Sequence, residues 1–328
     1  MMAGYSGPIV DAHHHFWEPE LGKQPWLRPD VTIPFRYGPY DAIKRSYLPP
    51  DLLEDAAEFA IVGTVTMETE WELDDPVGEI VYTEKIAEEY GLPNASVAHA
   101  VLRDPQIEST LEELAGHEIV RGIRNKPGQA AGPTEAAANP SLLMDPQWRK
   151  GYALLGRYGL DFELQVAWWH FTEAVDLIEH FPTTQLTINH AGLPSDRSPE
   201  AIAGWTEALR RIARHDNVAI KISGIGLQGV PWTAENNRVI VETIAETFGP
   251  ERIMFASNFP VDSLAGSYRD IFGGFVEISK DWSPAEQSAA FIGNAVRYYR
   301  LPAELLSAHH PPIAARVRRE THGVTDDH

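Results

Sequence analysis

Eight short runs of apolar and β-branched residues, separated by segments with helical periodicity, constrain the fold of this chain more than any other feature. The runs begin near residues 9, 61, 96, 119, 161, 184, 218 and 252. Most intervals between them are long enough for a helical crossover between parallel strands. The alternation predicts an α/β fold, a single closed (β/α)8 barrel of the TIM type. A doubly wound open sheet is the alternative, but no glycine-rich phosphate-binding loop follows the first run.

The expected barrel occupies residues 1–308, and residues 309–328 read as a polar C-terminal tail. No stretch of linker-like composition divides the chain, so we expect one domain. Residues 18–50, rich in proline, tryptophan and tyrosine, form a long loop after strand 1. Loops of this length in compact proteins usually have a function, such as a lid or a pocket wall. The last helix is expected to run from a capping box at Ser283–Glu286 to Tyr299.

Charge and composition narrow the classes of partner. The chain has 27 basic and 47 acidic residues, a formal charge of −20, which argues against nucleic acid or an anionic membrane as a partner. It has no cysteine, which excludes disulfides, thiolate ligands and a cysteine nucleophile. No secretion signal or membrane-spanning run is visible, so a cytoplasmic location is expected. Homodimers are common among such barrels and are compatible with the sequence.

A histidine cluster, His13-His14-His15, ends the first predicted strand. Side chains alternate across a strand, so His13 and His15 project to one face and His14 to the other. Two neutral imidazoles on one face are suited to share a divalent metal ion. The alternative is a histidine-rich or tag-like N-terminus that binds nothing, although this cluster lies between apolar residues.

The C-terminal ends of the strands meet at one mouth of a (β/α)8 barrel. This rule brings His190, at the end of the sixth strand, to His13 and His15, which amounts to a three-histidine metal site with an open position for water. The same rule gathers further polar and aromatic candidates at the mouth: Glu68, Glu70, Arg124, Lys126, Gln165, Trp168, Trp169, His170, Lys221, Ser223 and Asn258.

The chain resembles the amidohydrolase superfamily, in particular the amidohydrolase-related branch that contains sugar-acid lactonases and 2-pyrone-4,6-dicarboxylate lactonase. The most specific motifs are Val10–Trp17, Lys221–Gly224 and Met254–Pro260; supporting ones are Arg121–Arg124, Phe162–Gln165, Asn189–Pro194 and Gly293–Ala295. The resemblance implies that His13, His15 and His190 face a metal or polarise a carbonyl. It also implies that Arg124 is a substrate-binding cation and that residue 258 is the general base.

The sequence departs from the superfamily at Asn258, where the wider superfamily has an aspartate. A neutral amide does not take a proton from water and is a poorer ligand for a hard cation. Candidates for the missing base are Glu68, Glu70, His170 and Asp262. Each also has an ordinary explanation: a solvated loop for the two glutamates, packing in a tryptophan wall for His170, and a helix N-cap for Asp262.

These observations predict a metal-dependent hydrolase that opens a lactone of a small organic or sugar acid by attack of activated water. The expected cofactor is one divalent ion, zinc first and manganese second, with a metal-free route through histidine hydrogen bonds left open. Substrate would contact Arg124 and Lys126, unless these two form an ordinary surface pair. The other expected substrate contacts are Gln165, Trp168, Trp169, Lys221 and Ser223. Two alternatives are a decarboxylase of an unsaturated acid and a non-catalytic barrel that binds a small acid.

Overall fold

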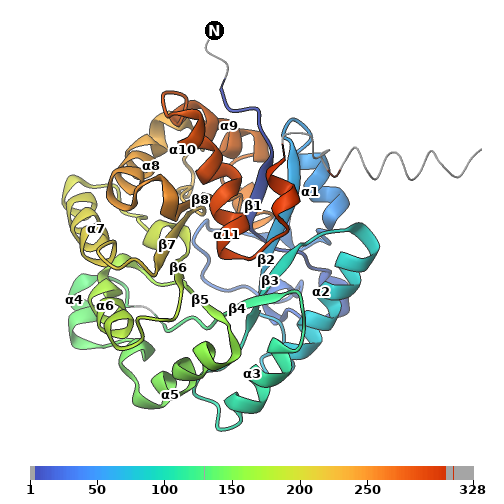
Figure 1. The fold of residues 1–328 in the computed structure, drawn as a ribbon, viewed down its shortest axis with the longest axis vertical. Coiled ribbons are helices and arrows are strands. Elements are labelled where there is room, and N and C mark those ends of the chain that lie inside the picture. The colour runs from blue at the N-terminus through green and yellow to red at the C-terminus, as the bar shows by residue number, and fades with distance from the viewer. Residues whose placement is uncertain (1–3, 129, 308–312, 314–328) are drawn as a thin grey trace, which may run out of the picture.

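The structure is a computed structural model, and it describes residues 4–128, 130–307 and 313. Eight parallel strands follow one another around a barrel in chain order, so the predicted (β/α)8 fold is confirmed (Figure 1). The strands are β1 (Ile9–His14), β2 (Ile61–Met67), β3 (Ala95–His99), β4 (Val120–Arg124), β5 (Asp161–Leu164), β6 (Leu186–Ile188), β7 (Val218–Ile222) and β8 (Ile253–Phe255).

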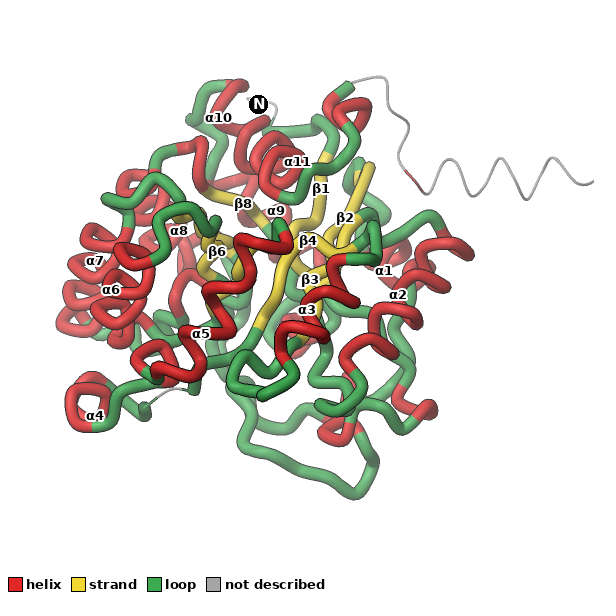
Figure 2. The backbone as a smooth tube through the Cα atoms, turned by 60° about the horizontal axis from the view of Figure 1, so that its bottom comes forward, coloured by secondary structure: helices red, strands yellow, loops and turns green. Residues whose placement is uncertain are grey.

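Helices surround the strands, as Figure 1 shows. They are α1 (Pro49–Asp55), α2 (Pro76–Tyr90), α3 (Ile107–Ala115), α4 (Pro133–Ala138), α5 (Pro146–Leu154), α6 (Phe171–His180), α7 (Pro199–Ile212), α8 (Ala234–Phe248), α9 (Tyr268–Ile278), α10 (Pro284–Ser288) and α11 (Asn294–Tyr298). Among the described residues, none of the helices has the length and apolar character needed to cross a membrane. Figure 2 shows long connecting loops gathered at one end of the barrel, with α10 and α11 at the other.

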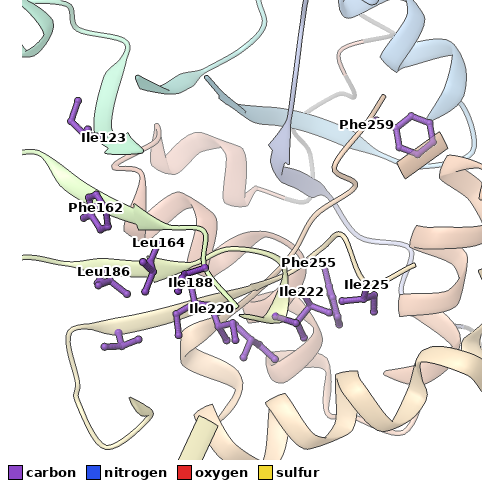
Figure 3. Close-up of a cluster of buried hydrophobic side chains, with 14 of the residues drawn as sticks. Ile123, Phe162, Leu164, Leu186, Ile188, Ile220, Ile222, Ile225, Phe255 and Phe259 are labelled. Atoms are coloured by element: carbon purple, nitrogen blue, oxygen red, sulfur yellow. The ribbon is translucent and has the colours of Figure 1, made fainter. Parts of the chain in front are cut away.

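The core lies between the outer faces of the strands and the surrounding helices. Strand residues such as Phe162, Ile188 and Ile220 are completely buried (Figure 3). The outward-facing residues of these strands are apolar, whereas polar residues such as Glu163 and Lys221 are buried inside the barrel and pair with each other. Burial of so many large side chains makes the barrel a rigid frame for the loops at its ends.

The seam between β1 and the segment after β8 closes the barrel. The Asn258 backbone N–H donates to the His13 carbonyl, and the His15 N–H donates to the Phe259 carbonyl, both at 2.7 Å. The buried Asp11 carboxylate accepts from the Ser257 N–H at 2.9 Å and from the Tyr268 hydroxyl at 3.1 Å. The seam therefore fixes the histidine cluster against Asn258, although 243 or more positions separate them in the numbering.

Two predicted segments differ from the structure. The helix expected over 283–299 is interrupted by a π-helical stretch, Ala289–Gly293, between α10 and α11. Helix α9 was not predicted, although Ser267 and Asp270 form a reciprocal capping box at its start. The predicted tail at residues 309–328 lies outside the described residues apart from Ile313.

Candidate functional site

Three buried imidazoles from opposite parts of the chain lie together at the C-terminal end of the strands. The ring centroids of His13 and His15 are 5.3 Å apart, and those of His13 and His190 are 4.5 Å apart. His15 directly follows β1, and His190 follows β6 in a tight turn with φ of 51°. The strand-end rule therefore predicted a real juxtaposition.

All three imidazoles are neutral. Burial is the main cause that lowers the pKa of His13 and His190 well below the usual value, and it lowers the pKa of His15 to about 3. Nδ1 of His15 lies 3.1 Å from the Met67 carbonyl oxygen. A carbonyl only accepts, so Nδ1 carries the proton and Nε2 keeps a lone pair. Nδ1 of His190 lies 2.9 Å from the Ser223 hydroxyl.

The donor chemistry of these residues fits a divalent metal. Both ring nitrogens of His13 are buried without a hydrogen-bond partner in the described structure, an arrangement that a ligand to nitrogen would satisfy. Neutral imidazole nitrogen is a common zinc donor. However, within residues 4–128, 130–307 and 313, no three His, Cys, Asp or Glu side chains are already arranged as a metal site. Asn258, which lines the adjacent cavity, carries a neutral amide and not a carboxylate, so only the three imidazole nitrogens are assessed here as metal donors.

A cavity of about 450 Å³ opens beside these histidines. His15, His190 and Asn258 line it, whereas His13 does not. An aromatic wall is formed by Trp17, just before the long loop, and by Trp26 and Phe35 within it. The remaining polar and charged side chains that line the cavity are Arg36, Glu68, Thr69, Glu70, Arg124, Lys126, Gln165 and Ser195.

Arg124 forms the most extensive polar contacts in the cavity. Its Nε donates to Glu68 Oε1 at 2.6 Å, and its Nη2 donates to the Glu68 carbonyl at 2.7 Å. Its Nη1 donates to Gln165 Oε1 at 3.0 Å. Arg124 and Glu68 are both buried, so the ordinary explanations are wrong for them: Arg124 is not part of a surface pair, and Glu68 is not on a solvated loop.

Glu68 is ionised in this pair. Burial alone would raise its pKa, but Arg124 and then Lys126 outweigh it and hold the pKa of Glu68 below its usual range. A carboxylate of low pKa is a weak base, so the geometry disfavours Glu68 as the proton acceptor. Glu70, at the half-exposed rim, pairs with Lys126. Its φ of 55° turns the chain sharply at this point.

Asn258 and Asp262 form a buried pair, of which Asn258 lines the cavity and Asp262 lies behind it. The Asn258 amide Nδ2 donates to Asp262 Oδ1 at 2.6 Å, and the Tyr37 hydroxyl donates to the same oxygen at 2.9 Å. Asp262 lies inside a short 3-10 helix, Val261–Leu264, so its interpretation as a helix N-cap is wrong. Burial raises the pKa of Asp262 to about 6, and its Oδ2 has no hydrogen-bond partner within the described part of the chain.

Apart from His13 and Asp262, five predicted site residues do not line the cavity: the expected substrate contacts Lys221, Ser223, Trp168 and Trp169, and the candidate base His170. Lys221 is buried in β7 and pairs with Glu163 at 3.0 Å. Trp168 and Trp169 line a separate groove of about 250 Å³ beside α6 and α7. His170 is buried, with Nε2 accepting from the Ala130 N–H at 3.0 Å and Nδ1 2.9 Å from Glu173. The strand-end rule places a residue along the barrel axis but does not determine which way its side chain points.

The sequence-based reasoning did not single out Arg36 and Ser195, which also line the cavity. Arg36 lies in the long loop, which was expected to form a pocket wall. The contacts of its side chain arise only when this loop is folded, so the sequence did not reveal them. Ser195 directly follows the Asn189–Pro194 motif. Its position next to this motif was the only sequence feature that could have identified it as a cavity residue.

Comparisons with known proteins agree with this architecture. Residues 10–301 match a protein family described as Amidohydrolase. The chain is 36% identical to an uncharacterised protein, y4mH, of Sinorhizobium fredii, over 89% of this chain and 98% of that one. It is 26% identical to an L-fucono-1,5-lactonase of Burkholderia multivorans, over 89% and 96%. A crystal structure of a B. multivorans amidohydrolase with bound zinc shares 25% identity and a TM-score of 0.73, covering 90% of this chain and 99% of that one.

Proposed function

This chain belongs to the amidohydrolase family, and we propose that it is a hydrolase that opens a lactone of a small organic or sugar acid. The observation that carries the proposal is the meeting of three neutral imidazoles beside a cavity that also contains Arg124 and Asn258. The lactonase relatives support the reaction class. A cavity of about 450 Å³ is suited to a small cyclic ester.

His13, His15 and His190 would hold the metal ion, with zinc favoured over manganese by the nitrogen donors. When bound, such an ion polarises a carbonyl oxygen and makes a coordinated water more acidic. The neutral state of the three histidines suits this role because protonated imidazole does not bind a cation. Metal analysis of the purified protein is expected to find about one equivalent, lost in H13N and retained in H180N, where His180 is exposed.

The protein side chains orient the reactants. Asn258 donates its amide hydrogen to Asp262, so its carbonyl oxygen remains to accept a hydrogen bond from the attacking water. Arg124, fixed by Glu68 and Gln165, presents a rigid positive charge on the cavity wall, suited to an oxygen on which negative charge develops. The aromatic wall excludes bulk water from an apolar part of the substrate.

Asp262 is the proton acceptor that best fits among the candidates. Glu68 is held ionised by Arg124, Glu70 pairs with Lys126 at the rim, and His170 lies away from the cavity. The Asp262 carboxyl has a pKa near the working range of a general base. It does not line the cavity itself, so a single intervening water is required between it and the reacting water.

The test is a substrate panel that separates this proposal from its alternatives. Five- and six-membered lactones, simple amides and unsaturated carboxylic acids are each incubated with the purified protein. Acid release is followed by titration and carbon dioxide by gas analysis. We expect ring opening of at least one lactone with no carbon dioxide. Release of carbon dioxide would support the decarboxylase, and binding of small acids without turnover would support the non-catalytic barrel.

A further inference from the structure

Arg36, in the long loop after β1, is the one charged side chain lining the cavity whose charge is not balanced by an ion pair in the described structure. The lining includes three cations and two carboxylates. Arg124 pairs with Glu68, and Lys126 pairs with Glu70. Within residues 4–128, 130–307 and 313, Arg36 has no carboxylate within 4.0 Å. Counted over the lining side chains alone, the cavity wall has an excess of one positive charge, in a chain whose formal charge is −20. The buried carboxyl of Asp262 lies behind this wall, and the charge of Arg36 lowers its pKa against the raising effect of burial.

The Arg36 guanidinium is held in place by neighbouring groups. One of its nitrogens donates to the Gly224 carbonyl. The guanidinium also lies over the ring of Tyr37 at 4.8 Å, and the Tyr37 hydroxyl is fixed by Asp262. A preorganised guanidinium loses less conformational entropy when it binds an anion than a free one does. Several of its five N–H donors remain for a ligand.

Gly224 locates this charge relative to the histidines. A Cβ atom at Gly224 would lie 2.6 Å from Nδ1 of His190 and 3.1 Å from Nη1 of Arg36. Gly224 has φ of 58°, a conformation that glycine adopts without strain. The imidazole and the guanidinium thus approach the same piece of backbone. An anionic group bound by Arg36 would lie next to the group that His190 contacts.

We propose that Arg36 selects substrates that carry one carboxylate in addition to the lactone ester, so that this chain prefers a monoanionic lactone to a neutral sugar lactone. Arg36 is a positioning and specificity-determining residue in this proposal, which rests on the proposed lactone hydrolysis. A planar guanidinium binds a carboxylate through two parallel hydrogen bonds, whereas a neutral hydroxyl group engages only one. The proposal distinguishes this chain from what the name of the L-fucono-1,5-lactonase relatives would suggest.

The experiment compares two lactones that differ only in charge: a six-membered lactone with one ring carboxylate and its primary carboxamide analogue. Wild type, R36Q, R36K and R28Q are assayed for KM and kcat. Arg28 is an exposed arginine of the same loop that does not line the cavity, so R28Q is the matched control. For the carboxylate substrate, R36Q is expected to raise KM by about 10- to 100-fold, the range for one charge-assisted hydrogen-bonding group. R36K should retain part of the preference, and R28Q all of it.

The carboxamide substrate provides the readout that a structural role would not produce. The charge of Arg36 lowers the pKa of Asp262, so R36Q is expected to change kcat on both substrates alike. KM for the carboxamide should be unchanged in R36Q, so the wild-type preference for the carboxylate, measured as the ratio of the two KM values, disappears. An equal rise in KM on both substrates, or a wild type that prefers the carboxamide, would overturn the proposal.

Binding of tetrahydropyran-2-carboxylate, a cyclic ether that cannot be hydrolysed, is measured by calorimetry in the same variants. If the wild type hydrolyses neither lactone, the proposed function fails. A wild type that binds the ether carboxylate, with binding lost in R36Q, still supports the role of Arg36. Undetectable binding by the wild type, or equal binding by R36Q, contradicts it.

Discussion

Arg124 Nε lies 2.6 Å from Glu68 Oε1, and both side chains are almost completely excluded from solvent. The pair joins the end of β4 to the residue after β2 in the wall of the cavity. The guanidinium also holds the Glu68 carbonyl, so the pair fixes the start of the loop that carries Thr69 and Glu70. Arg124 therefore has two roles: it holds the backbone of the site in place, and it supplies a positive charge to the cavity wall.

Removal of Glu68 should destabilise the protein strongly. E68A leaves a buried guanidinium without its partner, which typically costs about 3–5 kcal/mol in the free energy of unfolding. The control is E70A, which removes the carboxylate of the half-exposed pair with Lys126 and should cost about 0–1 kcal/mol. Denaturant titration measures both. Similar losses for the two variants would show that the buried pair has no special role.

An exchange of the amide and the carboxylate tests the pairing of Asn258 with Asp262. D262N removes the proposed proton acceptor and should lower kcat by about 10²- to 10⁴-fold. N258D places two carboxyl groups within hydrogen-bonding distance, where both cannot ionise, and should also lower kcat. The double variant N258D/D262N restores one amide and one carboxylate and should recover part of the activity. Wild-type kcat in D262N would exclude Asp262 as the acceptor.

The ionisation of Asp262 should determine how kcat depends on pH. The pKa of Asp262 is raised to about 6, so below this pH the group is protonated and does not accept a proton. We expect kcat to fall on the acid side with an inflection near 6. The residual activity of D262N should lack this inflection. An unchanged acid limb in D262N would assign the titration to another group.

Stability should respond to pH through Glu79, a buried residue of α2 whose Oε1 accepts from the Thr69 N–H and hydroxyl, both at 2.7 Å. Burial, followed by the charge of Glu68, raises the pKa of Glu79 to about 8. Between about pH 4.5 and 8, Glu79 is protonated in the folded protein but ionised in the unfolded chain. The free energy of unfolding that Glu79 contributes therefore decreases as pH rises through this interval.

E79Q removes this titration. Relative to wild type, the variant should gain at most about 1.4 kcal/mol in unfolding free energy for each pH unit across that interval. Urea titrations at pH 5 and pH 8 measure the difference. E88Q, an exposed position on the same helix, is the control and should show no such trend. A pH-independent difference for E79Q would mean that Glu79 is ionised in the folded protein.

The alternation of strands and helices was sufficient to predict the barrel, because parallel strands covered on both faces have a distinctive apolar pattern. The strand-end rule then predicted that the strand-end residues meet at one end of the barrel, and His15, His190, Arg124, Gln165 and Asn258 line the cavity there. His13 lies beside His190 without lining the cavity. The rule was wrong for Lys221, because an inward-facing lysine inside β7 finds Glu163 within the barrel.

The loops could not be predicted in the same way. Trp168, Trp169 and His170 lie shortly after β5, between this strand and α6. The tryptophans line the separate groove, and His170 and Trp169 hydrogen-bond to the backbone of Ala130. Arg36 depends on contacts with Gly224 and Tyr37 that exist only in the folded loop. Local periodicity contains no information on such long-range contacts.

The central claim is that the imidazoles beside the cavity carry out lactone hydrolysis, and the kcat/KM of H190N on a lactone turned over by the wild type tests it most directly. Asparagine keeps a polar side chain of smaller size, and far-ultraviolet circular dichroism verifies that the variant is folded. The account predicts a loss of at least about 10²-fold, as is usual when a group that polarises the reacting carbonyl is removed. H215N, in which a histidine remote from the cavity is replaced, should keep wild-type activity. A folded H190N with wild-type kcat/KM would contradict the account.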